Sequence, residues 1–307
     1  MRVVFFGTPA FAVPSLRALL EEDLTVEAVV TQPDRPQGRS RSALIPSPVK
    51  EDALALGLPV LQPERPTGDL FTASLRRYAP ELGVVVGYGH ILRPAILEIP
   101  THGMINVHAS LLPRHRGAAP VQGAILAGDS RTGVTIMQLD PGLDTGPILH
   151  SISTPILPGE TAGSLTERLA DLGARALVEA IGLMRDGALR PTPQDEAAAT
   201  MAPKLTRDAA RIQWTDPADA VARAIRAYDP APGAWSLLDG AAMKLFGPMP
   251  LPESGRPGEV LRTVPQLVVA TGTGAVSIAE VQPAGRRRMT AREWVRGRHP
   301  GDEGQFR

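Results

Sequence analysis

The stretch "INVHASLLPRHRGAAP", from Ile105 to Pro120, decides the expected fold of this 307-residue chain. It begins with apolar residues typical of a buried strand, and then places Asn106 and His108 two residues apart. Because the side chains of a strand alternate between its two faces, both polar groups lie on one face. Open α/β sheets bind ligands beyond the carboxyl ends of their strands. We therefore expect a functional site where a strand at Met104–His108 ends.

The sequence around this strand alternates between strand-like and helix-like segments. Apolar runs typical of strands occur at Arg2–Phe6, Thr25–Thr31, Val84–Val86 and Gly133–Gln138, and helical spacing of apolar residues occurs at Phe11–Leu20, Ala119–Ala127 and Thr161–Met184. Buried strands that alternate with helices are typical of parallel βαβ units. The first part of the chain is therefore predicted to be α/β, a Rossmann-like, mostly parallel sheet with helices on both faces.

The second part of the chain has a different pattern. Prolines and small residues without periodicity in Gly187–Pro203 are typical of a linker, and a helix is expected at Asp216–Ala227. Short β-rich runs broken by Gly and Pro then predict a small, OB-like β-barrel. A chain of this length usually forms two domains. We expect a catalytic domain at residues 1–188, a linker at 189–204 and a C-terminal β-barrel domain at 205–307.

Composition narrows the classes of function. The sequence contains no cysteine, which excludes disulfides and thiolate metal ligands and favours a cytoplasmic location. Lys plus Arg equals Asp plus Glu at 32 each, which argues against bulk polyanion binding but leaves room for a local basic face. No apolar run approaches the ~20 residues that a membrane-spanning helix needs. We therefore expect no membrane association.

A second polar segment completes the candidate site. The Gly-rich stretch "LDPGLDTG", from Leu139 to Gly146, follows the next expected strand and offers Asp140 and Asp144. Together with Asn106 and His108 it suits acyl transfer: an amide stabilises an oxyanion, an imidazole moves protons or holds charge, and a carboxylate orients the imidazole and raises its pKa. The histidines are scattered along the sequence, and a single carboxylate in the candidate site does not make a cluster of metal ligands. No metal site is therefore expected.

Two other classes of enzyme fit parts of the pattern weakly. Ser110 with His108 and Asp144 suggests a hydrolase triad, but no G-x-S-x-G motif surrounds this serine. The first strand and Gly7 suggest a nicotinamide-dependent oxidoreductase, but "FFGTPAF" lacks G-x-G-x-x-G.

These residues resemble the signature of the 10-formyltetrahydrofolate-dependent formyltransferases. The family pattern is an asparagine, a histidine two residues later, "SLLP" just beyond, and an aspartate in a Gly-rich loop. The resemblance implies that Asn106, His108 and Asp144 are catalytic, with Asp144 rather than Asp140 as the family aspartate. It also implies that Ser110, Leu111, Leu112 and Pro113 contact the folate.

Further stretches are similar to the branch of this family that acts on methionyl-tRNA. These are "FFGTPAFAVPSL", "TQPDRPQGRS", "RGAAPVQGAI", "KLT", "IQW" and "PAPGAW". The branch usually has "NPWPGAW" where this chain has "DPAPGAW", from Asp229 to Trp235. The resemblance places Arg39 at the tRNA acceptor end. The arginine-rich run "RRRMTAREWVRGR" adds a predicted phosphate-binding face with Arg286, Arg287 and Arg288.

The resemblance implies formyl transfer from 10-formyltetrahydrofolate to the amino group of methionyl initiator tRNA, by a protein expected to be a monomer. Alternatives within the same fold are transfer to the amine of a sugar nucleotide and hydrolysis of the formylated folate. A binding protein that kept only the fold is a further alternative, against which the intact Asn106, His108 and Asp144 argue.

Overall fold

The computed structural model describes residues 1–22, 24–37, 43–296 and 304–307 of the chain. It consists of two compact units. Unit 1 comprises Met1–Pro120, Thr132–Thr154 and Thr166–Met201, and unit 2 comprises Val121–Arg131, Pro155–Leu165 and Ala202–Arg307. The two units are interleaved along the chain, whereas the sequence pattern predicts consecutive domains. Within the described ranges, no helix has both the length and the apolarity needed to cross a membrane.

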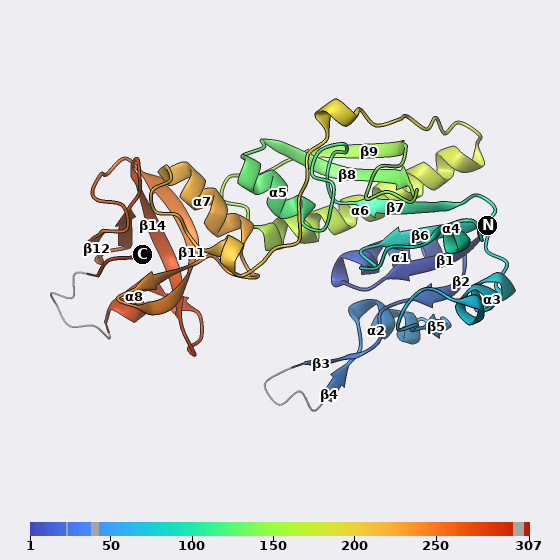
Figure 1. Ribbon diagram of the computed structural model, residues 1–307, viewed down its shortest axis with the longest axis horizontal. Helices are drawn as coiled ribbons and strands as arrows, with labels where there is room; N and C mark the ends of the chain where they lie inside the picture. The colour runs from blue at the N-terminus through green and yellow to red at the C-terminus, as the bar shows by residue number, and fades with distance from the viewer. Residues whose placement is uncertain (23, 38–42, 297–303) are drawn as a thin grey trace. The chain divides into compact units, whose positions relative to one another are not determined.

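Unit 1 is built on a seven-stranded sheet with the order β5-β2-β1-β6-β7-β8-β9 (Figure 1). Its strands are β1 (Arg2–Gly7), β2 (Thr25–Val30), β5 (Val60–Leu61), β6 (Leu82–Val86), β7 (Met104–His108), β8 (Arg131–Gln138) and β9 (Ile148–Pro155). In this order, each strand from β5 to β7 is parallel to its neighbour, and β8 is antiparallel to β7. The predicted mostly parallel sheet is confirmed. The edge strand β9 was not predicted, because half of its residues are polar and its side chains alternate between partly buried and exposed.

Helices cover both faces of this sheet. They are η1 (Ala10–Ala12), α1 (Val13–Glu21), α2 (Pro48–Ala55), α3 (Asp69–Arg77), α4 (Pro94–Leu97), the long α6 (Ala162–Arg185), whose first residues belong to unit 2, and the short η2 (Glu196–Ala198). Strands β3 (Arg35–Gln37) and β4 (Ala43–Ile45) pair antiparallel and form a separate two-stranded sheet. On one face, Phe6 and Met104 form a buried cluster with Leu75 of α3 and Ile96 of α4.

The other face of β7 lies against α6. A side chain at Gly173 of α6 would meet the side chain of Val107 at 2.9 Å, so only glycine lets the helix approach the strand this closely. Val107 therefore faces α6. Because side chains alternate along a strand, Asn106 and His108 point to the opposite face.

Unit 2 contains an antiparallel sheet with the order β10-β11-β14-β13-β12, and β15 pairs with β14. The strands are β10 (Trp235–Leu238), β11 (Ala241–Leu251), β12 (Val260–Arg262), β13 (Leu267–Ala270), β14 (Ala275–Pro283) and β15 (Met289–Thr290), and the helices are α5 (Pro120–Ala127), η3 (Asp208–Ala210), α7 (Ala218–Ala227) and α8 (Ala291–Val295). Helix α7 packs on β11 and β14. Val221 and Ile225 of α7 enter the same core as Leu245 and Ile278 of these strands.

The last four residues of the chain join the two ends of this sheet. Arg307 exchanges two backbone hydrogen bonds with Leu237 of β10, at 3.1 and 2.8 Å. On the other side, the Phe306 N–H donates to the Gly258 carbonyl at 2.8 Å, next to β12. The Phe306 ring is buried, and its centroid lies 5.2 Å from that of Trp214. The sheet thus curls into the predicted small barrel, with a closing segment that the sequence pattern did not indicate.

We expect Phe306→Ala to lower the free energy of unfolding of unit 2 by about 3–5 kcal/mol, the usual cost of removing a buried phenyl ring. Tryptophan occurs only at positions 214, 235 and 294, all in unit 2, so denaturant titration followed by tryptophan fluorescence reports on this unit alone. Val264→Ala, at a side chain that is 70% exposed, is the control. Equal losses in the two variants would show that the C-terminal segment does not close the barrel.

Candidate active site

Asn106 lies in the middle of the sheet, on β7. Its neighbours on the adjacent strands are Val85 of β6 and Met137 of β8. The residue is the only asparagine in the sequence, and it is partly exposed. Within the described part of the chain, its side-chain amide has no hydrogen-bond partner, so both amide hydrogens remain available to a ligand.

His108 ends β7 and is buried, with 5% of its surface exposed. Its Nε2 lies 3.0 Å from the carbonyl oxygen of His115. Because a carbonyl oxygen only accepts hydrogen bonds, Nε2 carries the hydrogen and donates it. The other ring nitrogen, Nδ1, lies 3.7 Å from Oδ2 of Asp144, which is within ion-pair distance but longer than a hydrogen bond. In neutral His108 the free lone pair therefore faces Asp144.

Burial lowers the pKa of His108 below its ordinary value. The charge of Asp144 and the hydrogen bond to the His115 carbonyl oppose this effect without cancelling it. Asp144 thus raises the pKa of His108, as expected from the sequence, but burial has the larger effect and the net shift is downward. The desolvation of a buried imidazolium outweighs its attraction to a carboxylate 3.7 Å away.

Asp144 lies in the Gly-rich loop between β8 and β9. Its Oδ2 accepts a hydrogen bond from the Gly117 N–H at 2.8 Å. The loop folds back tightly at Gly146, where a Cβ atom would lie 1.8 Å from the Gln138 carbonyl oxygen. Asp140 instead accepts hydrogen bonds from the Thr145 hydroxyl and the Gly142 N–H within the loop. The structure therefore brings Asp144 to His108 and uses Asp140 to shape the turn.

The four residues predicted to contact folate divide into two kinds. Ser110 is fully buried and its hydroxyl donates to the Arg114 carbonyl at 2.6 Å, which leaves it unsuited to act as a nucleophile. Leu112 is also buried, and its N–H donates to the Thr135 hydroxyl at 3.1 Å. Leu111 and Pro113 are only partly buried. Ser110 and Leu112 thus shape the turn, while Leu111 and Pro113 keep surface that a ligand can contact.

Sequence reasoning missed a segment that borders this site, Thr192–Met201, which we call the strap. Thr192 exchanges two backbone hydrogen bonds with Ile148, both at 2.8 Å. The Gln194 side chain donates to the carbonyl oxygens of Asp144 and Gly146. Thr200 accepts a hydrogen bond from the His115 N–H at 2.8 Å. The strap lies within the predicted linker, which lacks any periodicity that would have indicated these contacts.

The predicted tRNA-binding arginines have different surroundings. Arg39 lies outside the described residues. Arg286 and Arg287 are exposed between β14 and β15. Arg288 is instead held by Asp229 at 3.0 Å and Glu280 at 2.6 Å, and it lies over the ring of Phe246. Its charge is thus neutralised within unit 2, so only Arg286 and Arg287 of the three remain suited to bind phosphate.

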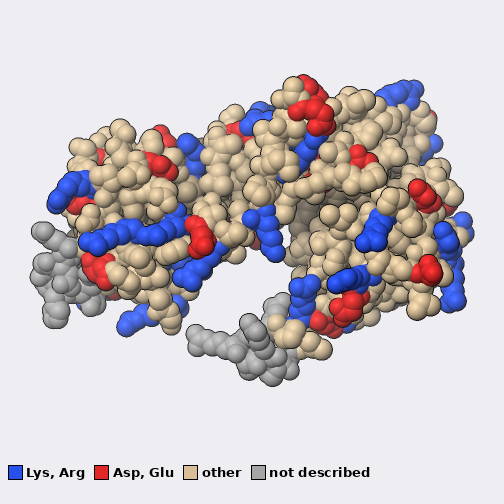
Figure 2. Space-filling model, viewed as in Figure 1, with Lys and Arg blue, Asp and Glu red and all other residues tan. Residues whose placement is uncertain are grey.

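A basic and aromatic surface of unit 2, which we call the Trp235 surface, was also missed. The guanidinium groups of Arg207 and Arg211 lie 5.0 and 5.6 Å from the centre of the Trp235 ring. Lys244 and Gln282 line the adjoining pocket of about 400 Å³, whose described lining residues include no Asp or Glu. On the face of unit 2 that Figure 2 shows, acidic side chains stand between the Lys and Arg side chains.

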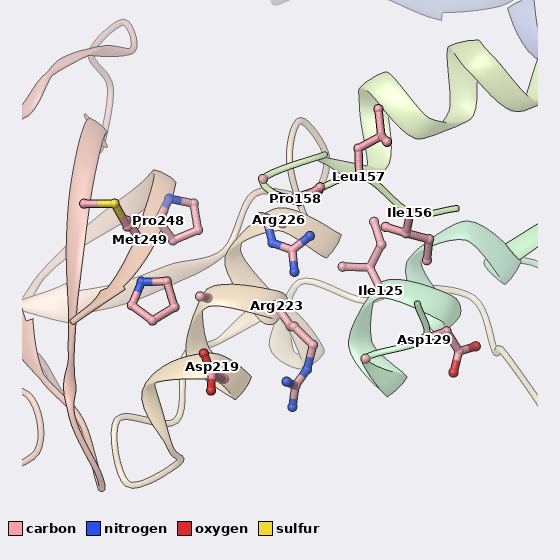
Figure 3. A pocket seen from close by; sticks show the side chains of 14 residues that line it. Ile125, Asp129, Ile156, Leu157, Pro158, Asp219, Arg223, Arg226, Pro248 and Met249 are labelled. Atoms are coloured by element: carbon pink, nitrogen blue, oxygen red, sulfur yellow. The ribbon is translucent and has the colours of Figure 1, made fainter. Parts of the chain in front are cut away.

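A larger pocket, of about 570 Å³, lies within unit 2 (Figure 3). Arg223 and Arg226 of α7 enter it, and burial together with the charge of Arg223 lowers the pKa of Arg226. Asp129 and Asp219 also line this pocket, so the two arginines are matched by two carboxylates. None of the described residues predicted for catalysis or for folate or tRNA binding lines it.

Within the described ranges, no group of three or more His, Asp or Glu side chains is placed to hold a metal ion.

Comparison with known proteins shows similarity over nearly the whole chain. The formyl transferase family matches residues 1–181, and the formyl transferase C-terminal domain matches residues 204–299. The chain is 46% identical over 303 residues to a methionyl-tRNA formyltransferase of Chloroflexus aggregans, covering 97% of this chain and 98% of that protein.

Two solved structures share the fold. HypX from Aquifex aeolicus, in complex with tetrahydrofolic acid, matches all of this chain with a TM-score of 0.65 and 21% identity. The chain covers 51% of HypX and thus spans about half its length. An N-formyltransferase from Helicobacter canadensis, in complex with folinic acid and dTDP-3-aminofucose, matches 92% of this chain and 98% of its own with a TM-score of 0.68 and 18% identity. On the family matches and the 46% identity, the chain belongs to the formyl transferase family, among the methionyl-tRNA formyltransferases.

Proposed function

We propose that this protein transfers a formyl group from 10-formyltetrahydrofolate to the amino group of methionyl initiator tRNA. The observation that carries the proposal is the meeting of Asn106, His108 and Asp144 at the end of β7, in a chain 46% identical to a methionyl-tRNA formyltransferase. The reaction uses substrates of translation and one-carbon metabolism, so we also propose that it takes place in the cytoplasm. We retain the expectation that the protein acts as a monomer.

The folate supplies the formyl carbon when it is bound. Leu111 and Pro113 would contact it, because both keep exposed apolar surface directly after β7. Ser110 and Leu112 would act indirectly, since their hydrogen bonds to Arg114 and Thr135 hold the turn in shape.

Asn106 would donate a hydrogen bond to the formyl oxygen as negative charge develops on it. One such donor typically lowers the barrier by about 3–4 kcal/mol. The amide has no partner within the described chain, so no existing hydrogen bond has to break. Its position on a central strand also keeps the donor fixed during the reaction.

His108 and Asp144 would together accept the proton that the attacking amine releases. The lowered pKa favours the neutral form of His108, which could take up this proton. The imidazolium that forms would be stabilised by Asp144 and by the His115 carbonyl, which are 3.7 and 3.0 Å from the ring nitrogens. The bond between the formyl carbon and N10 of the folate would then break, and N10 would take up the proton, directly or through water, so that tetrahydrofolate leaves neutral. In this scheme Asp144 stabilises the imidazolium that forms during the reaction. It does not keep His108 protonated before the reaction.

We further propose that unit 2 binds the tRNA through the Trp235 surface together with Arg286 and Arg287. The surface combines cations with an aromatic ring, a combination that suits a nucleic-acid backbone and its bases. The described residues that line its pocket include no carboxylate to repel phosphate.

The reaction is tested by incubating the purified protein with formyl-labelled donor in three mixtures: with methionyl initiator tRNA, with an amino-sugar nucleotide, and with buffer alone. We expect label in the tRNA only. Label in the sugar nucleotide, or free formate in buffer alone, would replace the proposal by transfer to a sugar or by hydrolysis.

We expect His108→Ala to lower kcat by about 10²–10⁴-fold and Asn106→Ala by about 10²–10³-fold, the usual effects of losing a proton acceptor and an oxyanion donor. His150→Ala is the matched control, because that histidine belongs to unit 1 but pairs with Glu179. Circular dichroism checks that all three variants fold. Retention of more than half the wild-type kcat in both site variants would exclude the assignment.

We expect Asp144→Asn to lower the pKa of His108 further, because the anionic neighbour that favours the imidazolium is removed. If neutral His108 is the working form, the rate falls as pH drops through this pKa. The acidic limb of the pH–rate profile should then move to lower pH in the variant, while the plateau rate decreases. NMR titration of the His108 ring measures the pKa directly. An unchanged value would rule out the electrostatic contact.

We expect charge reversal at Arg286 and Arg287, or at Arg207 and Lys244, to weaken tRNA binding and reduce its salt dependence, since each lost phosphate contact lowers the slope of log K against log salt by about 0.9. Folate binding should be unchanged. Reversal of Arg76 and Arg77, exposed at the end of α3 in unit 1, is the control. An equal loss in the control would indicate a general effect of net charge.

A further inference from the structure

Gln194 of the strap uses every hydrogen-bonding position of its side-chain amide. Nε2 donates to the carbonyl oxygens of Asp144 and Gly146 at 2.9 and 2.7 Å. Oε1 accepts from Nε and Nη2 of Arg116 at 3.0 and 2.8 Å. A flipped amide would place its NH₂ group against the guanidinium donors, so Arg116 fixes the orientation in which Gln194 donates to the loop.

Arg116 is itself firmly held. It is 4% exposed, and its guanidinium donates to both carboxylate oxygens of Glu196, at 2.9 and 2.8 Å. Its backbone N–H donates to the Thr200 carbonyl at 2.8 Å. The strap thus supplies Gln194, Glu196 and Thr200 to one arginine of the segment that follows β7. A bidentate arginine–carboxylate pair is geometrically specific, which makes Arg116 a rigid support.

These contacts close a ring around Asp144. The Gly117 N–H, next to Arg116, donates to the carboxylate of Asp144 at 2.8 Å, and Gln194 holds the carbonyl of the same residue. Asp144 has a φ of 56°, in the left-handed region that residues other than glycine rarely adopt. Such a conformation persists where the surroundings hold it. Here the restraint comes from Gly117 on the carboxylate side and from Gln194 on the backbone side.

We propose that Gln194 is a positioning residue for formyl transfer, which holds the Asp144 loop so that the carboxylate stays within ion-pair distance of His108. The proposal rests on the proposed function and adds to it a residue that acts through Asp144 rather than on the reacting atoms. Without the two donors of Gln194, the carbonyls of Asp144 and Gly146 lose their partners and the backbone can relax out of the left-handed region. The carboxylate then moves away from Nδ1 of His108.

The test uses two variants of the full-length protein. Gln194→Met keeps the length of the side chain and removes all four hydrogen bonds. Gln194→Glu keeps the acceptor for Arg116 and removes only the donors to the loop, so it serves if the first variant folds poorly. Gln213→Glu, at an exposed glutamine of unit 2, is the matched control for the added charge. We expect kcat to fall about 10- to 100-fold in both Gln194 variants, the scale of a small misplacement of a catalytic group, with KM for the folate donor little changed.

A double-mutant cycle separates positioning from general stability. If Gln194 acts through Asp144, then Gln194→Met should have little further effect on kcat in the Asp144→Asn background. The same loss of kcat in both backgrounds would overturn the proposal, because it would mean that Gln194 supports the fold alone.

NMR titration of His108 tests the contact without reference to activity. In Gln194→Met the His108 pKa should shift downwards, in the direction expected for Asp144→Asn. If the wild-type protein formylated no tRNA while this shift was observed, the proposed reaction would fail and the positioning role would stand. A wild-type pKa in the variant would overturn the positioning role whatever the reaction.

Discussion

The close approach of α6 to β7 at Gly173 is the constraint on which the catalytic geometry depends. Because a side chain at position 173 would collide with Val107, the helix and the strand fix which face of β7 lies against α6. Alternation along the strand then directs Asn106 and His108 to the other face. The proposed active site is therefore positioned by the packing of Val107 between its two polar neighbours. Packing of this kind tolerates little change, since the cores of proteins are filled to the density of organic crystals.

The same burial sets the proton chemistry. An exposed histidine keeps a pKa near its ordinary value. A carboxylate beside an exposed histidine raises that pKa. His108 is buried, so the cost of desolvating the imidazolium prevails and lowers the pKa of the ring. In the proposed reaction, Asp144 and the His115 carbonyl would lower the energy of the imidazolium that forms. This arrangement places electrostatic stabilisation where charge develops, as expected of a preorganised site.

The sequence predicted the local parts of this structure and missed the distant ones. The bounds of β7 were predicted correctly, because an apolar run between a glycine and a polar pair shows where the strand begins and ends. Residues that meet across long stretches of chain have no such pattern. Gln194 contacts a loop 48 to 50 residues away, and Arg288 pairs with Asp229 at a separation of 59. Burial depth is also hidden in the sequence, so the sequence did not show that desolvation outweighs Asp144 in setting the pKa of His108. The roles of Asn106, His108 and Asp144 were predicted from the family resemblance. The spacing of these residues alone was also compatible with other classes of enzyme.

The strap has a consequence for how the protein is made. A chain emerging from the ribosome has β7 and the Asp144 loop outside long before residues 192–201 follow, and domains fold as their segments become available at roughly 5–20 residues per second. Until Gln194 arrives, the carbonyls of the Asp144 loop lack their donors. The catalytic pair can therefore be fully assembled only when the last part of unit 1 has emerged. The longest segment of unit 2 starts at the next residue, Ala202, so a nascent chain can complete this loop before the bulk of unit 2 has emerged.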